Sequence, residues 1–112
     1  MTEPVIDSEV FEEMRELLED SLGEFINTYL GNSPKLLENI SQALPEADLE
    51  AIYINAHQLK GGSGSIGAMQ VCRLANQIEE KARTGDESNL SELFSEMQSA
   101  YELVVTELKT HL

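Results

Sequence analysis

The chain has 112 residues, of which 41% are hydrophobic and 25% are charged, a size and balance that suit one globular domain with a single core. Its formal net charge is −14, from 21 acidic and 7 basic residues. Nucleic acids and anionic membrane surfaces are bound through clusters of lysine and arginine, so this charge argues against both as partners. The acidic residues are scattered, which is typical of a solvated outer surface.

The single cysteine, Cys72, excludes an internal disulfide and fits a reducing compartment. The first residues are polar and acidic, unlike a signal peptide, and no apolar run approaches the ~18 residues of a membrane span. We therefore expect a cytoplasmic protein made of one domain over residues 1–112.

The first half of the chain shows apolar residues at helical spacing. Asp7 or Ser8 is expected to cap a short helix that ends at Asp20 and Ser21, with a stripe of Val10, Phe11, Met14, Leu17 and Leu18. A second pattern runs from residue 22 to about 44, with a stripe of Leu22, Phe25, Ile26, Tyr29, Leu30, Leu36, Leu37, Ile40 and Leu44. Pro34 either kinks this helix or begins a new one capped by Ser33. Because the stripe stays in phase, we favour one long kinked helix.

The second half predicts three more helices. One begins at residues 46–48 and runs to about 65, and Gly67 marks the turn that follows. The next helix ends at Gly85, and the residues expected on its inward face are Ala68, Val71, Cys72, Ala75, Ile78 and Ala82. The last runs from about 88 to 111, with a stripe of Leu90, Leu93, Phe94, Met97, Tyr101, Val104, Val105 and Leu108. Four long helices and short loops predict an all-α fold, an antiparallel four-helix bundle with a short N-terminal capping helix.

Residues 56–68, AHQLKGGSGSIGA, are unusual because they place glycines inside a helical pattern. The buried stripe of this helix is Leu49, Ile52, Ala56, Leu59, Ser63 and Ile66, and a second stripe beside it holds Tyr53, His57, Lys60, Gly61 and Gly64. Three helical glycines cost on the order of 3 kcal/mol, which makes sense where a partner approaches the backbone closely. Alternatively the helix ends near Lys60 and the glycines form a flexible turn, but Ile66 stays in phase.

Most sites that could carry chemistry are excluded by spacing. The two histidines, His57 and His111, show no metal-ligand spacing, so we expect no metal, and His111 is interpreted as part of the C-terminal tail. The glycine run from 61 to 67 lacks the order of a phosphate-binding loop, and no strand precedes it. Cys72 lies on an apolar stripe and is interpreted as a structural thiol.

Paired carboxylates occur at Glu12 and Glu13 and again at Glu79 and Glu80. We interpret both pairs as solvated faces rather than as general acid and base.

His57 remains. Imidazole is a competent nucleophile near neutral pH. Lys60 lies one turn away and could neutralise an anion on the ring, and no acidic residue lies three or four positions from His57. These residues permit a phosphoryl group to be carried transiently on His57. A lone histidine beside an apolar stripe is more often a structural or neutral surface residue, and that alternative stays open.

Residues 56–68 resemble the signature of histidine-containing phosphotransfer (HPt) domains of two-component phosphorelays. That signature has a histidine, an apolar residue two positions on, Lys-Gly, a small residue and then an apolar-Gly pair. The order of predicted helices on both sides also matches, so the resemblance extends over nearly the whole chain.

The resemblance implies that His57 accepts a phosphoryl group from an aspartyl phosphate of one receiver domain and passes it to an aspartate of another. Lys60 would stabilise the phosphoryl charge, and Gln58 would be able to hydrogen-bond it. The protein would then be a carrier rather than an enzyme, because the receiver supplies most of the catalysis. Any magnesium would belong to the receiver, and no cofactor is expected here.

The resemblance also implies a docking surface. Gly61 and Gly64 would let the receiver close over His57, with Tyr53 beside them, whereas Ser63 and Gly67 would allow the third and fourth helices to pack closely. The expected partners are receiver domains of response regulators and a sensor or hybrid histidine kinase, bound by a monomer.

Three alternatives remain open. The chain could be the phosphorylated domain of a chemotaxis-type kinase or a piece of a hybrid kinase, although we expect a free-standing protein. It could also be a helical adaptor that docks receiver-like partners without chemistry. An exposed His57 ring would favour the carrier, and a buried ring would favour the adaptor.

Overall fold

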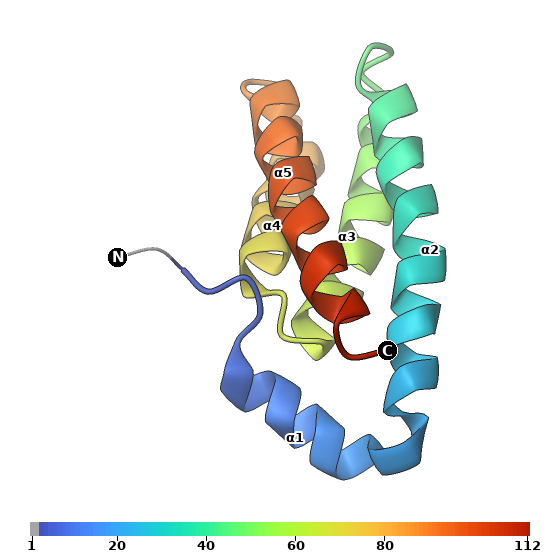
Figure 1. Cartoon of the computed structure of the whole chain (residues 1–112). Helices are drawn as coiled ribbons and strands as arrows, with labels where there is room; N and C mark the ends of the chain where they lie inside the picture. The colour runs from blue at the N-terminus through green and yellow to red at the C-terminus, as the bar shows by residue number, and fades with distance from the viewer. Residues whose placement is uncertain (1–2) are drawn as a thin grey trace.

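The computed structural model describes residues 3–112, which form five α-helices and no strand. The helices are α1 (Ser8–Leu18), α2 (Leu22–Ala43), α3 (Leu49–Ser65), α4 (Met69–Thr84) and α5 (Leu90–Lys109), with a 3-10 turn at Glu19–Ser21. Each helix from α3 to α5 reverses the direction of the one before it, and α1 lies across one end of the bundle (Figure 1). The predicted fold, a four-helix bundle with a short N-terminal capping helix, is confirmed.

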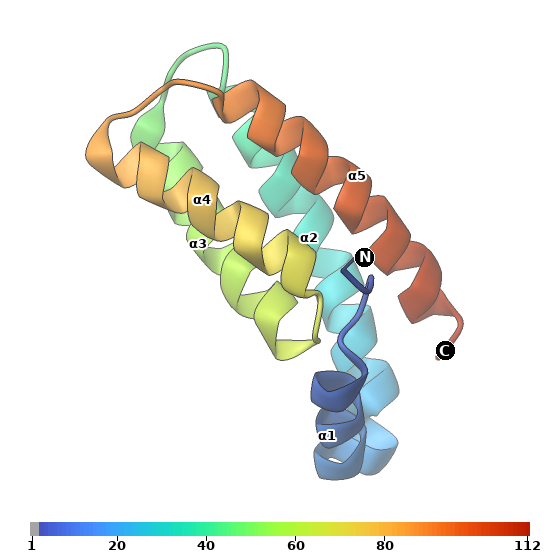
Figure 2. The same ribbon diagram turned by 90° about the vertical axis from the view of Figure 1, so that its left-hand side faces the viewer.

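The helix α3 lies at the centre of the packing. It packs extensively on both α2 and α4, whereas α2 and α5 touch each other much less, and α3 and α4 lie side by side in Figure 2. The predicted α3 stripe is buried at Ile52, Ala56, Leu59, Ser63 and Ile66. Within residues 3–112, no helix has the length and apolarity needed to cross a membrane.

Two open questions about helix continuity are answered by the backbone. Pro34 lies inside α2, so the second apolar pattern is one helix and not two. The hydroxyl of Ser33 is buried and donates to the carbonyl of Tyr29 at 2.5 Å. The helix α3 continues through its glycines to Ser65, so the alternative in which they form a flexible turn is wrong.

The capping helix α1 is held to the bundle by its first turn. The side chain of Asp7 accepts from the backbone N–H groups of Glu9 and Val10, and this identifies Asp7 as the N-cap. Its own N–H donates to the carbonyl of Gly67 at 2.8 Å. The predicted inward position of Leu17 is wrong, because its side chain is 78% exposed while Phe11 on the neighbouring face is buried.

The C-terminus also contacts α1. The ring of His111 lies 4.5 Å from the ring of Phe11, measured between centroids. Its Nδ1 lies 3.3 Å from a guanidinium nitrogen of Arg15. His111 is therefore a structural contact between the two ends of the chain, although the sequence alone indicated only a tail.

Candidate functional site

His57 stands at the middle of the solvent-facing side of α3, and its side chain is 59% exposed. Successive residues on a helix are about 100° apart, so Lys60 lies toward one side of His57 and Gln58 toward the other. Lys60 lies on the side of α3 that faces α4, where it contacts Glu79. Gln58 lies on the side that faces α2, where it lines a hollow together with residues of α2. The exposed ring is the feature that favours a carrier over an adaptor.

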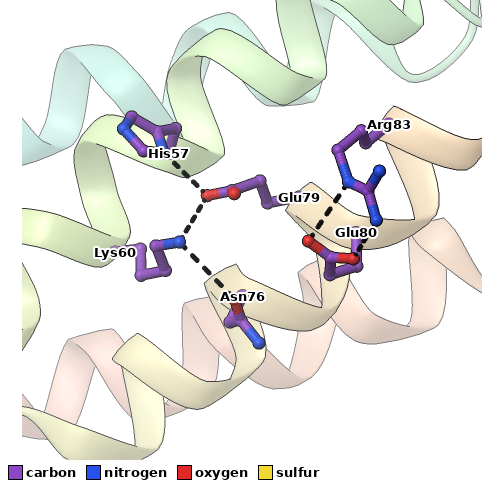
Figure 3. Close-up of polar contacts among 6 residues, drawn as sticks. All are labelled: His57, Lys60, Asn76, Glu79, Glu80 and Arg83. Carbon is purple, nitrogen blue, oxygen red and sulfur yellow. Dashed lines mark hydrogen bonds and ion pairs between the residues drawn. The ribbon is translucent and has the colours of Figure 1, made fainter.

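Glu79 of α4 holds both functional side chains of α3 through one oxygen. Its Oε1 lies 3.0 Å from Nδ1 of His57 and 2.9 Å from Nζ of Lys60 (Figure 3). The carboxylate is only 7% exposed, and burial by itself would raise its pKa. The hydrogen bonds from Lys60 and His57 outweigh burial and leave the pKa of Glu79 lowered, so the group is ionised at neutral pH.

The contact with Glu79 decides which nitrogen of His57 can react. An ionised carboxylate can only accept hydrogen bonds, so the Nδ1 of His57 must donate its proton to Glu79. In the neutral ring the other nitrogen, Nε2, then keeps its lone pair. Nε2 lies on the side of the ring away from Glu79 (Figure 3). The site therefore presents one oriented nucleophilic nitrogen to solvent.

The same contact affects Lys60. The hydrogen bond with Glu79 raises the pKa of Lys60, so its ammonium group stays charged. Its Nζ also lies 3.5 Å from Oδ1 of Asn76. A cation is thus held one helical turn from the exposed ring of His57.

The prediction that Glu79 and Glu80 form a solvated pair is right for one residue and wrong for the other. Glu80 is exposed and pairs with Arg83 at 2.6 Å. Glu79 is buried against α3, because neighbouring residues of α4 point about 100° apart. A signal in the sequence could have found it, since Glu79 is in phase with the inward residues Ala75 and Ala82.

Three residues predicted near the docking surface surround His57 in different ways. The ring of Tyr53 lies parallel to the imidazole within 16°, with centroids 6.1 Å apart. A Cβ at Gly61 would meet nothing within 4 Å, so the backbone there is open to a partner. Gln58 is exposed but points away from His57, toward a hollow beside α2.

The other predicted small residues, Gly64, Ser63 and Gly67, have three different surroundings. Gly64 faces α4, because a Cβ there would lie 3.3 Å from Sγ of Cys72. The small side chain of Ser63 is buried, and its hydroxyl bonds the hydroxyl of Tyr29 on α2, at 2.8 Å; its role in the close packing of α3 and α4 stays a prediction. Gly67, in the turn between α3 and α4, has φ of +86° and packs against the backbone of Asp7.

Cys72 is half-buried, and burial raises the pKa of its thiol while the nearby Lys60 opposes the shift. This is the surrounding of a structural thiol rather than of a nucleophile. Within the described part of the chain, no three His, Cys, Asp or Glu side chains are grouped so that they could hold a metal ion.

The Hpt domain family model matches residues 24–109 of this chain, which include all of α3 and α4. The chain belongs to the Hpt domain family. The resemblance carried by residues 56–68 is thereby confirmed.

Known proteins of the same kind are similar to the chain in sequence and in structure. Histidine-containing phosphotransfer protein 4 of Arabidopsis thaliana is 29% identical over 99 residues, which cover 83% of this chain and 78% of that protein. The crystal structure of histidine-containing phosphotransfer protein B of Pseudomonas aeruginosa PAO1 matches with a TM-score of 0.93 and 27% identity, over 98% of this chain and 96% of that one.

A maize histidine-containing phosphotransfer protein shows the same fold with a TM-score of 0.78 and 19% identity, over 96% of this chain and 86% of that one. The family match, the Arabidopsis relative and the Pseudomonas structure show that the chain is a phosphoryl carrier of two-component phosphorelays, which acts with receiver domains and kinases.

Proposed function

We propose that His57 is the residue that carries the phosphoryl group and that Nε2 is the atom that bonds phosphorus. The observation that carries this proposal is the contact of its Nδ1 with the ionised Glu79 on an otherwise exposed ring. This contact leaves Nε2 oriented and accessible, and in the neutral ring Nε2 holds the lone pair that an imidazole nucleophile needs.

The transfer is a displacement at phosphorus. The lone pair of Nε2 attacks the phosphorus of an aspartyl phosphate in a receiver domain. An N–P bond forms as the bond between phosphorus and the carboxylate oxygen of the aspartate breaks. The electron pair of the broken bond returns to the receiver's aspartate. The imidazole ring gains positive charge during attack, and Glu79 compensates that charge at Nδ1. Transfer to a second receiver is the same step in reverse.

Lys60 is the cation best placed to meet the phosphoryl oxygens. Its ammonium group and the Nδ1 of His57 are bound to the same Glu79 oxygen, so Lys60 is held beside the ring and does not block Nε2, which lies on the other side. For Gln58, a hydrogen bond to the phosphoryl group stays a prediction, because its side chain lies on the side of α3 that faces α2. We assign most of the catalysis to the receiver domain, since this site supplies a nucleophile and one cation.

We further propose that the partners are receiver domains of response regulators and a sensor or hybrid histidine kinase, and that the carrier works in the cytoplasm. The lone half-buried thiol supports a reducing compartment.

The direct test mixes the protein with a phosphorylated receiver domain and follows the phosphoryl group. Wild type should acquire an acid-labile, base-stable phosphoryl group, and His57→Gln should acquire none. His111→Gln is the matched control, because it removes the other imidazole and should keep full acceptance. Acceptance that survives in His57→Gln would refute the assignment of His57.

Lys60→Met provides the second test. It should slow acceptance by roughly 10- to 100-fold, the effect of losing one charge-assisted hydrogen bond in the transition state. The circular dichroism spectrum and thermal unfolding should show that the bundle remains folded. Unchanged transfer rates would remove Lys60 from the site.

A further inference from the structure

A hollow of about 600 Å³ lies between α2 and α3, directly beside the candidate site. We infer that this hollow receives an apolar side chain of the receiver domain, while Lys35 at its edge binds a carboxylate of the same partner. The inference rests on the proposed function, because it assumes that a receiver approaches His57.

The hollow is mainly apolar and has walls on two helices. Its walls include Tyr29, Gly31 and Lys35 on α2 and Gln58, Leu59 and Gly62 on α3. A concave apolar surface with a few polar groups at its edge is the usual form of a recognition site for an apolar group.

Glycines keep the hollow open. A Cβ at Gly31 would meet nothing within 4 Å, so packing does not require glycine at this position of α2. Glycine in the interior of a helix is unfavourable compared with almost any other residue except proline. On the opposite wall, a Cβ at Gly62 would only reach ordinary contact with the Tyr29 ring, at 3.5 Å. The two glycines therefore leave a space that the fold itself does not need.

The hollow is continuous with the surface around His57. Moving around α3 from His57 toward α2, the helical positions met in turn are Gly61, Ile54, Gln58 and Gly62. Gly61 has open space above it, and Ile54 is a large apolar side chain that is 44% exposed.

The opposite side of His57, toward α4, is different. It is occupied by charged groups that already have partners, which are Lys60 with Glu79 and Arg83 with Glu80. An interface core is typically apolar and poor in charges, so a receiver that covers His57 should extend toward α2 rather than α4.

The distribution of positive charge also supports a receiver domain as the partner that docks at the hollow. Five of the seven basic residues form ion pairs within residues 3–112, namely Arg15, Lys60, Arg73, Lys81 and Arg83. Lys35 forms none there and lies at the hollow, on a chain whose net charge is −14. A carboxylate of a partner that docks over the hollow would find Lys35 available.

The test fills the hollow and measures docking. Gly31→Leu places a side chain in the hollow, and Gly23→Leu is the matched control, because Gly23 lies on the same helix, also has open space, and does not line the hollow. In a His57→Gln background, isothermal titration with the receiver domain that phosphorylates the wild type should give a Kd at least about tenfold weaker for Gly31→Leu. Gly23→Leu should stay within about twofold.

Further measurements distinguish the possible failures. Gly31→Leu should melt no lower than wild type, because leucine favours helix more than glycine, so weaker binding could not be blamed on unfolding. Lys35→Gln should weaken binding at low salt and less at high salt. If wild type transfers phosphoryl through His57 but Gly31→Leu binds equally well, the inference about the hollow is wrong and the proposed function stands. If wild type accepts no phosphoryl group, the proposed function itself fails.

Discussion

Nδ1 of His57 on α3 lies 3.0 Å from Oε1 of Glu79 on α4, and these two residues are 22 positions apart in the chain. The contact sets the orientation of an otherwise exposed ring and determines which of its nitrogens is free. Because Lys60 shares the same carboxylate oxygen, a single buried charge organises both groups that we assign to phosphoryl transfer.

The first prediction concerns the charge of Glu79. Glu79→Gln keeps the size of the side chain and an oxygen that can accept from Nδ1, but it loses the negative charge. Hydrogen bonds to charged groups are worth about 1 kcal/mol more than neutral ones, so phosphoryl acceptance should slow by roughly 5- to 10-fold. Rapid-quench transfer from a phosphorylated receiver measures this rate.

A neighbouring carboxylate provides the control for that experiment. Glu80→Gln removes an exposed charge from the next position of α4, where the partner is Arg83 rather than His57. Its transfer rate should match wild type. Equal slowing in both variants would mean that overall charge matters and that the contact of Glu79 with His57 does not.

The second prediction is the pH dependence of stability. The pKa of Glu79 is lowered from its ordinary 4.5 in the folded protein, so its stabilising effect is complete above that value and is lost as pH falls below it. The pKa of Lys60 is raised above 10.5, so the effect of Lys60 is complete below 10.5 and is lost as pH rises further.

Urea unfolding of wild type and Glu79→Gln across this range tests the prediction. The difference between their free energies of unfolding should shrink as the pH falls below 4.5 and again as it rises above 10.5. A difference that does not change with pH would show that packing, and not charge, accounts for the effect of Glu79.

The third prediction concerns the buried bond between the hydroxyl groups of Tyr29 and Ser63, which joins α2 to α3 at 2.8 Å. Tyr29→Phe leaves the Ser63 hydroxyl buried without this partner and should lower the free energy of unfolding by about 1–3 kcal/mol. Adding Ser63→Ala should recover part of the loss, since both polar groups are then gone. Urea unfolding of wild type, Tyr29→Phe, Ser63→Ala and the double variant measures the coupling energy between the two hydroxyl groups. Strictly additive effects of the two substitutions would contradict the prediction.

The fourth prediction concerns the turn between α3 and α4. Gly67→Ala would place a Cβ 3.1 Å from the backbone oxygen of Asp7 at a φ of +86°. We expect a loss of about 1–2 kcal/mol or more from the left-handed backbone alone. Gly61→Ala is the control, because its Cβ meets open space in a helix and should raise stability by about 1 kcal/mol. Thermal unfolding of both variants should therefore move in opposite directions.

The sequence by itself determined much of this protein. Apolar residues repeat at helical spacing along each long segment, so local periodicity was enough to predict four long helices and the buried face of α3, with His57 and Gly61 on the stripe beside it. The spacing of His57, Lys60 and the glycines was enough to indicate the family. Periodicity was less informative on the short α1, where Leu17 fits the stripe but is exposed.

Only the tertiary structure decided which groups from different helices meet. Glu79, Tyr29 and Asp7 become partners of α3 and its following turn because packing brings distant helices together, and helical periodicity within one segment carries no information about such pairs. The hollow beside Gly31 arises in the same way, since it depends on how far α2 stands from α3. Local spacing therefore predicts the faces of each helix, whereas the chemistry of the site depends on side chains that only the assembled bundle places together.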